Sequence, residues 1–181
     1  SDEDAVRRVL AGDTGLFSLL VERYSKRVFG MGLMFFKNHD DASDFMQDVF
    51  IRAYGNLHTL RGGSKFYYWL MRVAYNHGVN MVKAGRNAAS LVDCDLFAGA
   101  DNTEVRHLRS ETERIVREAV SALPEKYRVC IDLFFFYGLP YAEISDMTGF
   151  PVNTIKSHVS RAKRMLRDSL RASMTEVNDE M

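Results

Sequence analysis

Basic side chains are concentrated in two stretches of this chain that almost lack acids. No Asp or Glu occurs from residue 49 to residue 92, and from 151 to 171 the only acid, Asp168, stands among Lys156, Arg161, Lys163, Arg164, Arg167 and Arg171. The formal net charge of the 181 residues is zero, so the cations are clustered rather than in excess. Because clustered Lys and Arg neutralise phosphates, this distribution favours contact with a polyanion, although a solvated helix face is the ordinary explanation of any one such segment.

Aromatic, amide and cationic side chains alternate between residues 65 and 83. Residues three or four positions apart share one face of a helix, and the face that this spacing predicts carries Lys65, Trp69, Arg72, Asn76, Asn80 and Lys83, with Phe66 and Tyr68 beside its start. Aromatic rings stack on unpaired bases while cations hold the backbone, so the pattern favours binding of single-stranded nucleic acid. Packing in the core is the alternative for the aromatics, equally favoured for Phe66 and less favoured for Tyr68 and Trp69.

Residues 141–169 have the spacing of a helix-turn-helix. Ile144 and the small Ser145 precede Gly149, which permits a left-handed turn, and Ile155 and Val159 follow at buried positions. The first half of the second helix would then enter the DNA major groove, where short polar groups and cations read base edges. The side chains that this arrangement directs at DNA are Asn153, Thr154, Lys156, Ser157, Ser160, Arg161 and Arg164. Lys163, Arg164 and Arg167 lie further along the helix, at positions suited to phosphate contacts.

A small acidic face precedes the aromatic segment. Asp44, Gln47 and Asp48 recur at helical spacing within an acid-rich run from Asp40 to Asp48. Acids at this position would repel DNA, so the face favours a protein partner. A solvated helix face is the alternative.

Helices must position all these groups, and apolar periodicity predicts where they lie. One helix enters at Asp13 or Thr14 and carries Leu16, Leu19, Leu20, Tyr24 and Val28, and another runs from about Asp41 with Phe45, Val49, Phe50, Ala53 and Leu57 inward. Further helices are expected over 65–84, 112–122, 125–137, 141–148 and 152–169. The predicted fold is therefore all-α, with two small helical domains at 1–88 and 111–173, a flexible linker at 89–110 and an acidic tail at 174–181.

The sequence contains no pattern that indicates catalysis. Cys94 and Cys130 lie far apart, the five histidines show no metal spacing, and neither a P-loop nor a nucleophile motif occurs. We expect no catalytic residue, no metal and no cofactor. No apolar run could span a bilayer and the acidic start does not resemble a signal peptide, so we expect a cytoplasmic protein.

Three segments together resemble regions 2 and 4 of bacterial sigma factors of the extracytoplasmic-function type, within the sigma-70 superfamily. They read DASDFMQDVFIRAY from residue 41, FYYWLMRVAYN from residue 66, and LPEKYRVCIDLFFFYGLPYAEISDMTGFPVNTIKSHVSRAKRML from residue 123. The resemblance extends from about Leu16 to Arg171. Several motifs in the expected order make it more specific than the helix-turn-helix alone.

This resemblance implies roles that composition does not. Asp44, Gln47 and Asp48 would dock on the coiled coil of the largest subunit of core RNA polymerase. The flap of the polymerase is a second contact of such factors. The segment from Lys65 to Lys83 would read and open the minus-10 element, with Trp69, Asn76 and Asn80 as the main candidates. The helix-turn-helix would read the minus-35 element as duplex. A separate anti-sigma factor is expected to control the protein by covering these faces.

The chain departs from the family pattern at four positions. Asn153 and Ser145 stand where Gly and Ala are usual, and Asn80 and Lys83 where many members have Asp and Arg, which leaves the minus-10 preference open.

A two-domain regulator that binds an operator without polymerase is the alternative function, and it would not require the acidic face. A nucleic-acid enzyme is a third, which the missing catalytic motifs disfavour.

Overall fold

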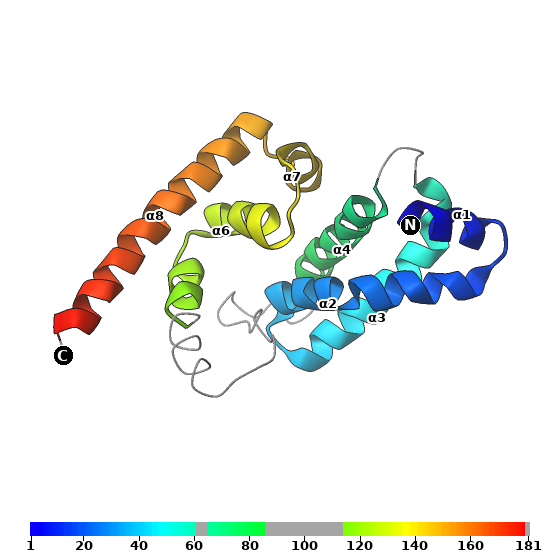
Figure 1. The fold of residues 1–181 in the computed structure, drawn as a ribbon, viewed down its shortest axis with the longest axis horizontal. Coiled ribbons are helices and arrows are strands. Elements are labelled where there is room, and N and C mark those ends of the chain that lie inside the picture. The colour runs from blue at the N-terminus through cyan, green and yellow to red at the C-terminus, as the bar shows by residue number, and fades with distance from the viewer. Residues whose placement is uncertain (61–64, 86–113, 180–181) are drawn as a thin grey trace. The chain divides into compact units, whose positions relative to one another are not determined.

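The computed structural model describes residues 1–60, 65–85 and 114–179, with side chains described as far as residue 172. It divides into two compact units, Ser1–Leu91 and Val92–Met181. Every regular element in the described ranges is helical (Figure 1). The all-α prediction is confirmed for this part of the chain, while the predicted linker at 89–110 lies outside it.

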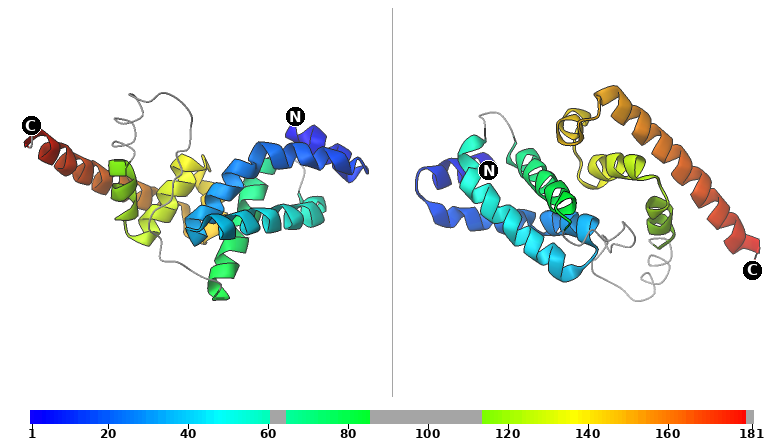
Figure 2. Two further views of the ribbon diagram at one scale, coloured as in Figure 1. Left: turned by 90° about the horizontal axis from the view of Figure 1, so that it is seen from below. Right: turned by 180° about the vertical axis from the view of Figure 1, so that it is seen from behind.

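The first unit is a helical bundle around α2. Its elements are α1 (Asp2–Leu10), η1 (Thr14–Leu16), α2 (Phe17–Phe36), α3 (His39–Asn56), η2 (Leu57–Thr59) and α4 (Phe66–Lys83). Helices α2, α3 and α4 pack against one another, as both views in Figure 2 show in blue, cyan and green. The core between them is apolar and fully buried, and its largest members are Leu20, Met31, Phe45, Leu57, Phe66, Leu70 and Met71.

The acidic start of α3 has a local cause. Lys37 ends α2 with a left-handed backbone (φ 57°), and Asn38 caps α3 by accepting hydrogen bonds from the backbone N–H groups of Asp40 (2.8 Å) and Asp41 (3.4 Å). Asp40 and Asp41 then occupy the first turn, where the helix dipole favours negative charge. Because this two-residue connection is tight, α3 returns directly along α2.

The second unit holds the helix-turn-helix. Residues 114–121 are helical, followed by α6 (Glu125–Ile131), η3, which is a π-helical turn at Asp132–Phe136, then α7 (Tyr141–Thr148) and α8 (Val152–Asp179). Helices α6 and α7 both pack on α8. The residues that close this core are at most 2% exposed, namely Cys130, Leu133, Leu139, Ile144, Ile155, Val159 and Ala162.

The elements differ from the sequence prediction at four places. Helix α1 was not predicted, Leu19 is 49% exposed rather than part of the α2 stripe, and α6 gives way to the π-helical turn after Ile131. Helix α8 continues to Asp179, ten residues beyond its predicted end at Ser169 and through most of the segment expected as a tail. The bounds of α7 agree with the prediction at both ends.

Candidate nucleic-acid interface and docking face

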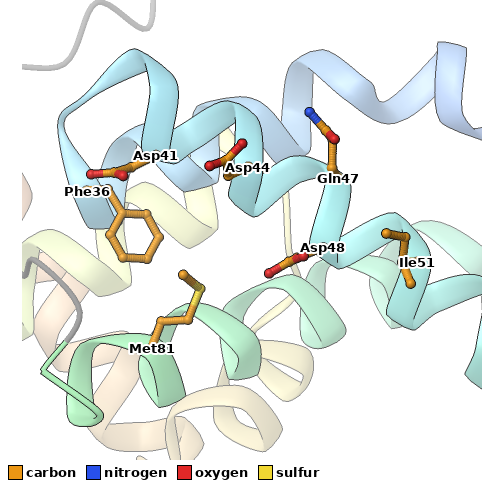
Figure 3. Close-up of a pocket in the computed structure, with 7 residues that line it drawn as sticks. All are labelled: Phe36, Asp41, Asp44, Gln47, Asp48, Ile51 and Met81. Carbon is orange, nitrogen blue, oxygen red and sulfur yellow. The ribbon is translucent and has the colours of Figure 1, made fainter.

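The three residues of the acidic face lie together on α3. Asp44 and Gln47 are exposed and Asp48 is partly exposed, and all three border one open pocket (Figure 3). We call Asp44, Gln47 and Asp48 the docking face. The pocket is also lined by Asp41 from the same helix, by Phe36 from α2 and by Met81 from α4. A basic side chain could therefore meet carboxylates at the rim and apolar atoms beneath.

Ile51 belongs to the same surface and was missed by the sequence analysis. It is 69% exposed, more than any other large apolar side chain described, and it borders the pocket. It follows Gln47 by four residues and Asp44 by seven, so it shares their helix face. An apolar residue at that spacing on an otherwise polar face was the available signal. Exposed aliphatic surface beside acids is suited to a protein partner rather than to DNA.

A buried histidine connects the docking face to α4. His77 is 8% exposed, its Nε2 atom lies 3.5 Å from Asp48 Oδ2, and its ring stacks on that of Phe45 with centroids 5.5 Å apart and an interplanar angle of 9°. His77 is therefore a core residue of the first unit. Asp48 therefore contacts a side chain of the helix that carries the aromatic segment.

The residues predicted on α4 separate by depth. Lys65, Asn76, Asn80 and Lys83 are exposed, whereas Tyr68, Trp69 and Arg72 are partly buried. These seven residues, without Phe66, are called the α4 face below. Lys65 Nζ lies 5.6 Å from the centroid of the Tyr68 ring, a cation–π arrangement.

Phe66 does not join the α4 face. It is 1% exposed, and its ring lies between Tyr24 and Trp69, with centroid separations of 5.7 and 5.8 Å. A ring enclosed in this way has no free surface for a base to stack on. The sequence left two interpretations of Phe66 open, and its place in the structure is that of a core residue.

A second pocket lies where α4 begins. It is lined by Asp2, Glu3, Arg23, Tyr24, Lys65, Phe66, Tyr67 and Tyr68. Tyr67 stacks on Tyr24 (centroids 5.5 Å apart, 29°), and the Tyr24 hydroxyl donates to the Asp2 carboxylate, which Arg23 also contacts. Burial first, and then the Asp2 carboxylate, raise the pKa of Tyr24 to about 12, so the phenol stays protonated. Neither Tyr24 nor the α1 acids were predicted here, because their approach to α4 is tertiary.

The turn between α7 and α8 is held by hydrogen bonds from short side chains. Gly149 has φ 75° and its N–H donates to Ser145 O (2.9 Å), which confirms the left-handed turn. Ser145 Oγ donates to Phe150 O (2.7 Å), while Thr148 Oγ1 donates to Ile144 O (2.7 Å) and accepts from Phe150 N (3.3 Å). The small side chain of Ser145 therefore ties the turn to α7.

The first half of α8 presents the predicted polar groups outward. Asn153, Lys156, Ser157, Ser160, Arg161 and Arg164 are exposed and Thr154 is partly buried, and we call these seven residues the recognition face. Ser157 Oγ donates to Asn153 O (2.9 Å), so that hydroxyl is engaged within the helix. Arg161 Nη1 lies 3.4 Å from the Tyr127 hydroxyl and lowers the pKa of that phenol.

The cations beyond the first turns share a shallow groove with this face. Its lining residues are Ser160, Arg161, Lys163, Arg164 and Arg167. On the opposite side of α8, His158 is 8% exposed, with its Nδ1 atom 3.6 Å from Cys130 Sγ and its ring edge-on to Tyr127 and Phe150. The second unit therefore directs hydroxyl, amide and basic groups outward from α8 and keeps His158 and Cys130 in the core.

Among the described residues, no group of three or more His, Cys, Asp or Glu side chains is arranged to hold a metal ion. In the same part of the chain, every helix is too short or too polar to cross a bilayer.

Comparison with known proteins agrees with this geometry. Residues 20–87 match the family described as Sigma-70 region 2, and residues 113–166 match the family described as Sigma-70, region 4. The RNA polymerase sigma-H factor of Pseudomonas aeruginosa is 33% identical over 97% of this chain and 96% of its own length. The ECF RNA polymerase sigma-E factor of Haemophilus influenzae is 35% identical over 96% of this chain and 97% of its own length.

A solved structure shares the fold. It is the co-crystal structure of the sigma factor RpoE with the anti-sigma factor NepR from Bartonella quintana, with a TM-score of 0.62 and 22% sequence identity. The match covers 86% of this chain and 96% of that one. The helical architecture of the two units therefore has a counterpart among experimentally determined structures.

Proposed function

Since this chain belongs to the sigma-70 family, as an alternative sigma factor of the extracytoplasmic-function type, we propose that its three exposed faces divide the work of transcription initiation. The docking face would bind core RNA polymerase, the α4 face would capture the minus-10 element, and the recognition face would read the minus-35 element. The chain would itself carry out no chemistry, which the polymerase performs, and it would act in the cytoplasm, where core polymerase is found.

The pocket beside α3 supports the docking role. Asp41, Asp44 and Asp48 place carboxylates around an apolar floor that includes Phe36 and Met81. A lysine or arginine of the polymerase coiled coil could lay its aliphatic stem on that floor while its charge meets the acids. The flap of the polymerase would contact the second unit.

The α4 face and the aromatic pocket at its start support strand capture. Opening a duplex costs about 1–2 kcal/mol per base-pair step in lost stacking, which a small domain can offset only by holding unpaired bases. Trp69 and Tyr68 offer partly exposed rings, Asn76 and Asn80 offer amides, and Lys65 and Lys83 offer charge for the backbone. Tyr24 and Tyr67 extend the ring surface and join the candidates.

The recognition face supports duplex readout. Lys156, Ser160 and Arg161 point away from the core on the first turns of α8, the part of a recognition helix that meets base edges. Arg164 and Arg167 follow along the groove at positions suited to phosphates. The hydrogen-bonded turn at Ser145 and Gly149 would hold α8 in a fixed orientation for this purpose.

Control by a separate anti-sigma factor is also proposed. The Bartonella sigma factor that shares this fold was crystallised with an anti-sigma factor. Here the docking face offers acid beside the exposed Ile51, and a basic, apolar inhibitor segment could cover both. An inhibitor there would exclude polymerase by direct competition.

The observation that carries the proposal is the separation of an acidic face on α3 from basic faces on α4 and α8 within a sigma-family chain. Run-off transcription from a library of promoter fragments, using core polymerase with and without the protein, tests it. Initiation at a defined subset of fragments that depends on the protein is the expected result. Tight binding to operator-like sites with no gain in initiation would instead indicate a regulator that acts without polymerase.

A further inference from the structure

An exposed phenylalanine lies beside the recognition face. Phe135, in η3, is 52% exposed, whereas Leu133 in the same turn and Leu139 shortly after it are at most 1% exposed. A single apolar side chain in water needs no explanation by itself. This one, however, lies against a cation of the DNA-facing helix.

Three aromatic rings contact one another in series, and two of them lie near that cation. Lys163 Nζ lies 4.8 Å from the centroid of Phe135 and 6.0 Å from that of Phe134. The two rings meet edge to face with centroids 4.9 Å apart, and Phe134 stacks on Tyr141 from α7 at 4.7 Å and 8°. We call Phe134, Phe135 and Tyr141 the aromatic shelf. Because Tyr141 belongs to the helix-turn-helix, the shelf is fixed relative to α8.

The position of Lys163 gives the shelf a use. Lys163 is exposed and borders the same groove as Ser160, Arg164 and Arg167, at the edge of the recognition face. A lysine side chain in water samples many rotamers, and ordering it on binding costs free energy. A ring face that already attracts the ammonium restricts it before DNA arrives, so less ordering remains to be done.

We propose that the aromatic shelf positions Lys163 to contact a DNA phosphate at the edge of the DNA major groove that α8 enters. Phe135 is then a positioning residue of promoter recognition. The inference rests on the proposed function of α8. It assigns a role to Phe135 that neither charge nor the helix-turn-helix pattern indicates.

The test uses the full-length protein assembled with core polymerase on a promoter selected from the library, at a temperature where the DNA stays closed. Promoter affinity is measured at several KCl concentrations for the parent, Lys163→Met, Phe135→Leu, Phe135→Tyr and the Phe135→Leu/Lys163→Met double variant. Met165→Leu, which changes another exposed apolar side chain of α8, is the matched control. Thermal unfolding midpoints show whether any variant is misfolded.

Lys163→Met should reduce the slope of log affinity against log salt by about 0.9, the value for one phosphate contact. Phe135→Leu should weaken binding about two- to fivefold, the range of an exposed cation–π contact, and Phe135→Tyr should restore it. The double variant should be no weaker than Lys163→Met, because Phe135 acts through Lys163.

Either of two results would overturn the proposal. One is that Phe135→Leu has the same affinity and salt slope as the parent. The other is that Phe135→Leu weakens binding as much in the Lys163→Met background as it does in the parent. A parent that gives no promoter-specific complex with polymerase would refute the proposed function itself, and the role of Lys163 with it. Normal parental binding combined with either of the first two results refutes only the shelf.

Discussion

At the scale of single residues, the recognition face supplies the clearest test of base reading. Arg161→Ala should weaken binding of the polymerase complex to its minus-35 element by about 1–3 kcal/mol and relax the preference at the base it contacts. Gel-shift titrations against the selected promoter and its single-base variants measure both effects. Arg171→Ala, an exposed arginine further along α8, is the charge-matched control and should leave the base preference intact.

If Arg161→Ala weakened binding equally to every sequence, the residue would be a phosphate contact rather than a reader of bases. Arg161 Nη1 also lies 3.4 Å from the Tyr127 hydroxyl, so Arg161→Ala removes a contact within the protein as well, and only the comparison between base variants identifies a reader of bases.

The docking face gives a second residue-scale prediction. Asp48→Arg should weaken binding to core polymerase about tenfold or more, because it reverses a charge at the rim of the acidic pocket. The fold should change little, since the Asp48 side chain is 48% exposed. Competition with a labelled sigma factor for core polymerase gives the affinity. Glu22→Arg makes the same charge reversal on α2 and should bind as the parent does; equal losses would point to net charge instead of the face.

A buried acid in the second unit predicts a dependence of stability on pH. Asp132 is 7% exposed, and burial, only partly opposed by Arg128, raises the pKa of its carboxyl to about 7. A folded-state pKa above the unfolded value of 3.8 means that the folded form binds the proton more tightly. Its contribution to stability is therefore complete below pH 4 and is lost as the pH rises to about 7.

Asp132→Asn should remove this dependence and raise the unfolding free energy at pH 8 by roughly 1–3 kcal/mol. Urea unfolding followed by circular dichroism at pH 5 and pH 8 measures it. Trp69 is the only tryptophan and lies in the first unit, so its fluorescence should report an unchanged transition. A variant less stable than the parent at pH 8 would show that the ionised carboxylate has a favourable partner.

At the scale of elements, the contact between α2 and α3 depends on a glycine. A Cβ atom on Gly32 would lie 2.8 Å from Phe45 Cδ1 and 3.0 Å from the backbone of Ala42. Gly32→Ala should therefore destabilise the first unit by about 1–3 kcal/mol, because the backbone of α3 would have to move. Trp69 fluorescence during urea unfolding reports the change.

Gly55→Ala in α3 is the matched control, since nothing lies within 4 Å of its added methyl group. Relief of the glycine penalty in a helix should stabilise this variant by a few tenths to about 1 kcal/mol. A Gly32→Ala variant as stable as Gly55→Ala would mean that the two helices can separate without cost.

Periodicity predicted most helices but could not predict features set by tertiary contacts. Helices α3, α4 and α7 have clear apolar stripes, such as Phe45, Val49 and Ala53, so their place and inner faces followed from the sequence. Helix α1 was missed because it is short and largely charged, and its buried residues are only Ala5, Val6 and Val9. The π-helical turn at Asp132–Phe136 was missed because its apolar residues continue the periodicity of α6.

The candidate sites were predictable to the extent that one helix carries them. Spacing placed Asp44, Gln47 and Asp48 on one face without any tertiary information. It could not tell the enclosed ring of Phe66 from the partly exposed Trp69, because depth depends on Tyr24, which belongs to α2. The contact of Tyr24 with Asp2 likewise joins residues 22 positions apart.

At the scale of the whole molecule, zero net charge shapes the expected behaviour. The 24 Lys and Arg side chains of the chain are matched by 24 Asp and Glu side chains, and the first turns of α1 and α3 are acidic, so attraction to DNA is confined to two faces. Non-specific binding grows with the number of phosphates neutralised, and each unit alone offers few. Free DNA should therefore bind weakly, and polymerase should be needed to present both faces to one promoter.

The most direct test of the central claim is the fluorescence of 2-aminopurine placed in the minus-10 element of a selected promoter. The account predicts an increase, reporting unstacked bases, only when both this protein and core polymerase are present, and its loss in Asp48→Arg. An increase with the protein alone, or a stable promoter complex with polymerase that never unstacks the probe, would contradict the account.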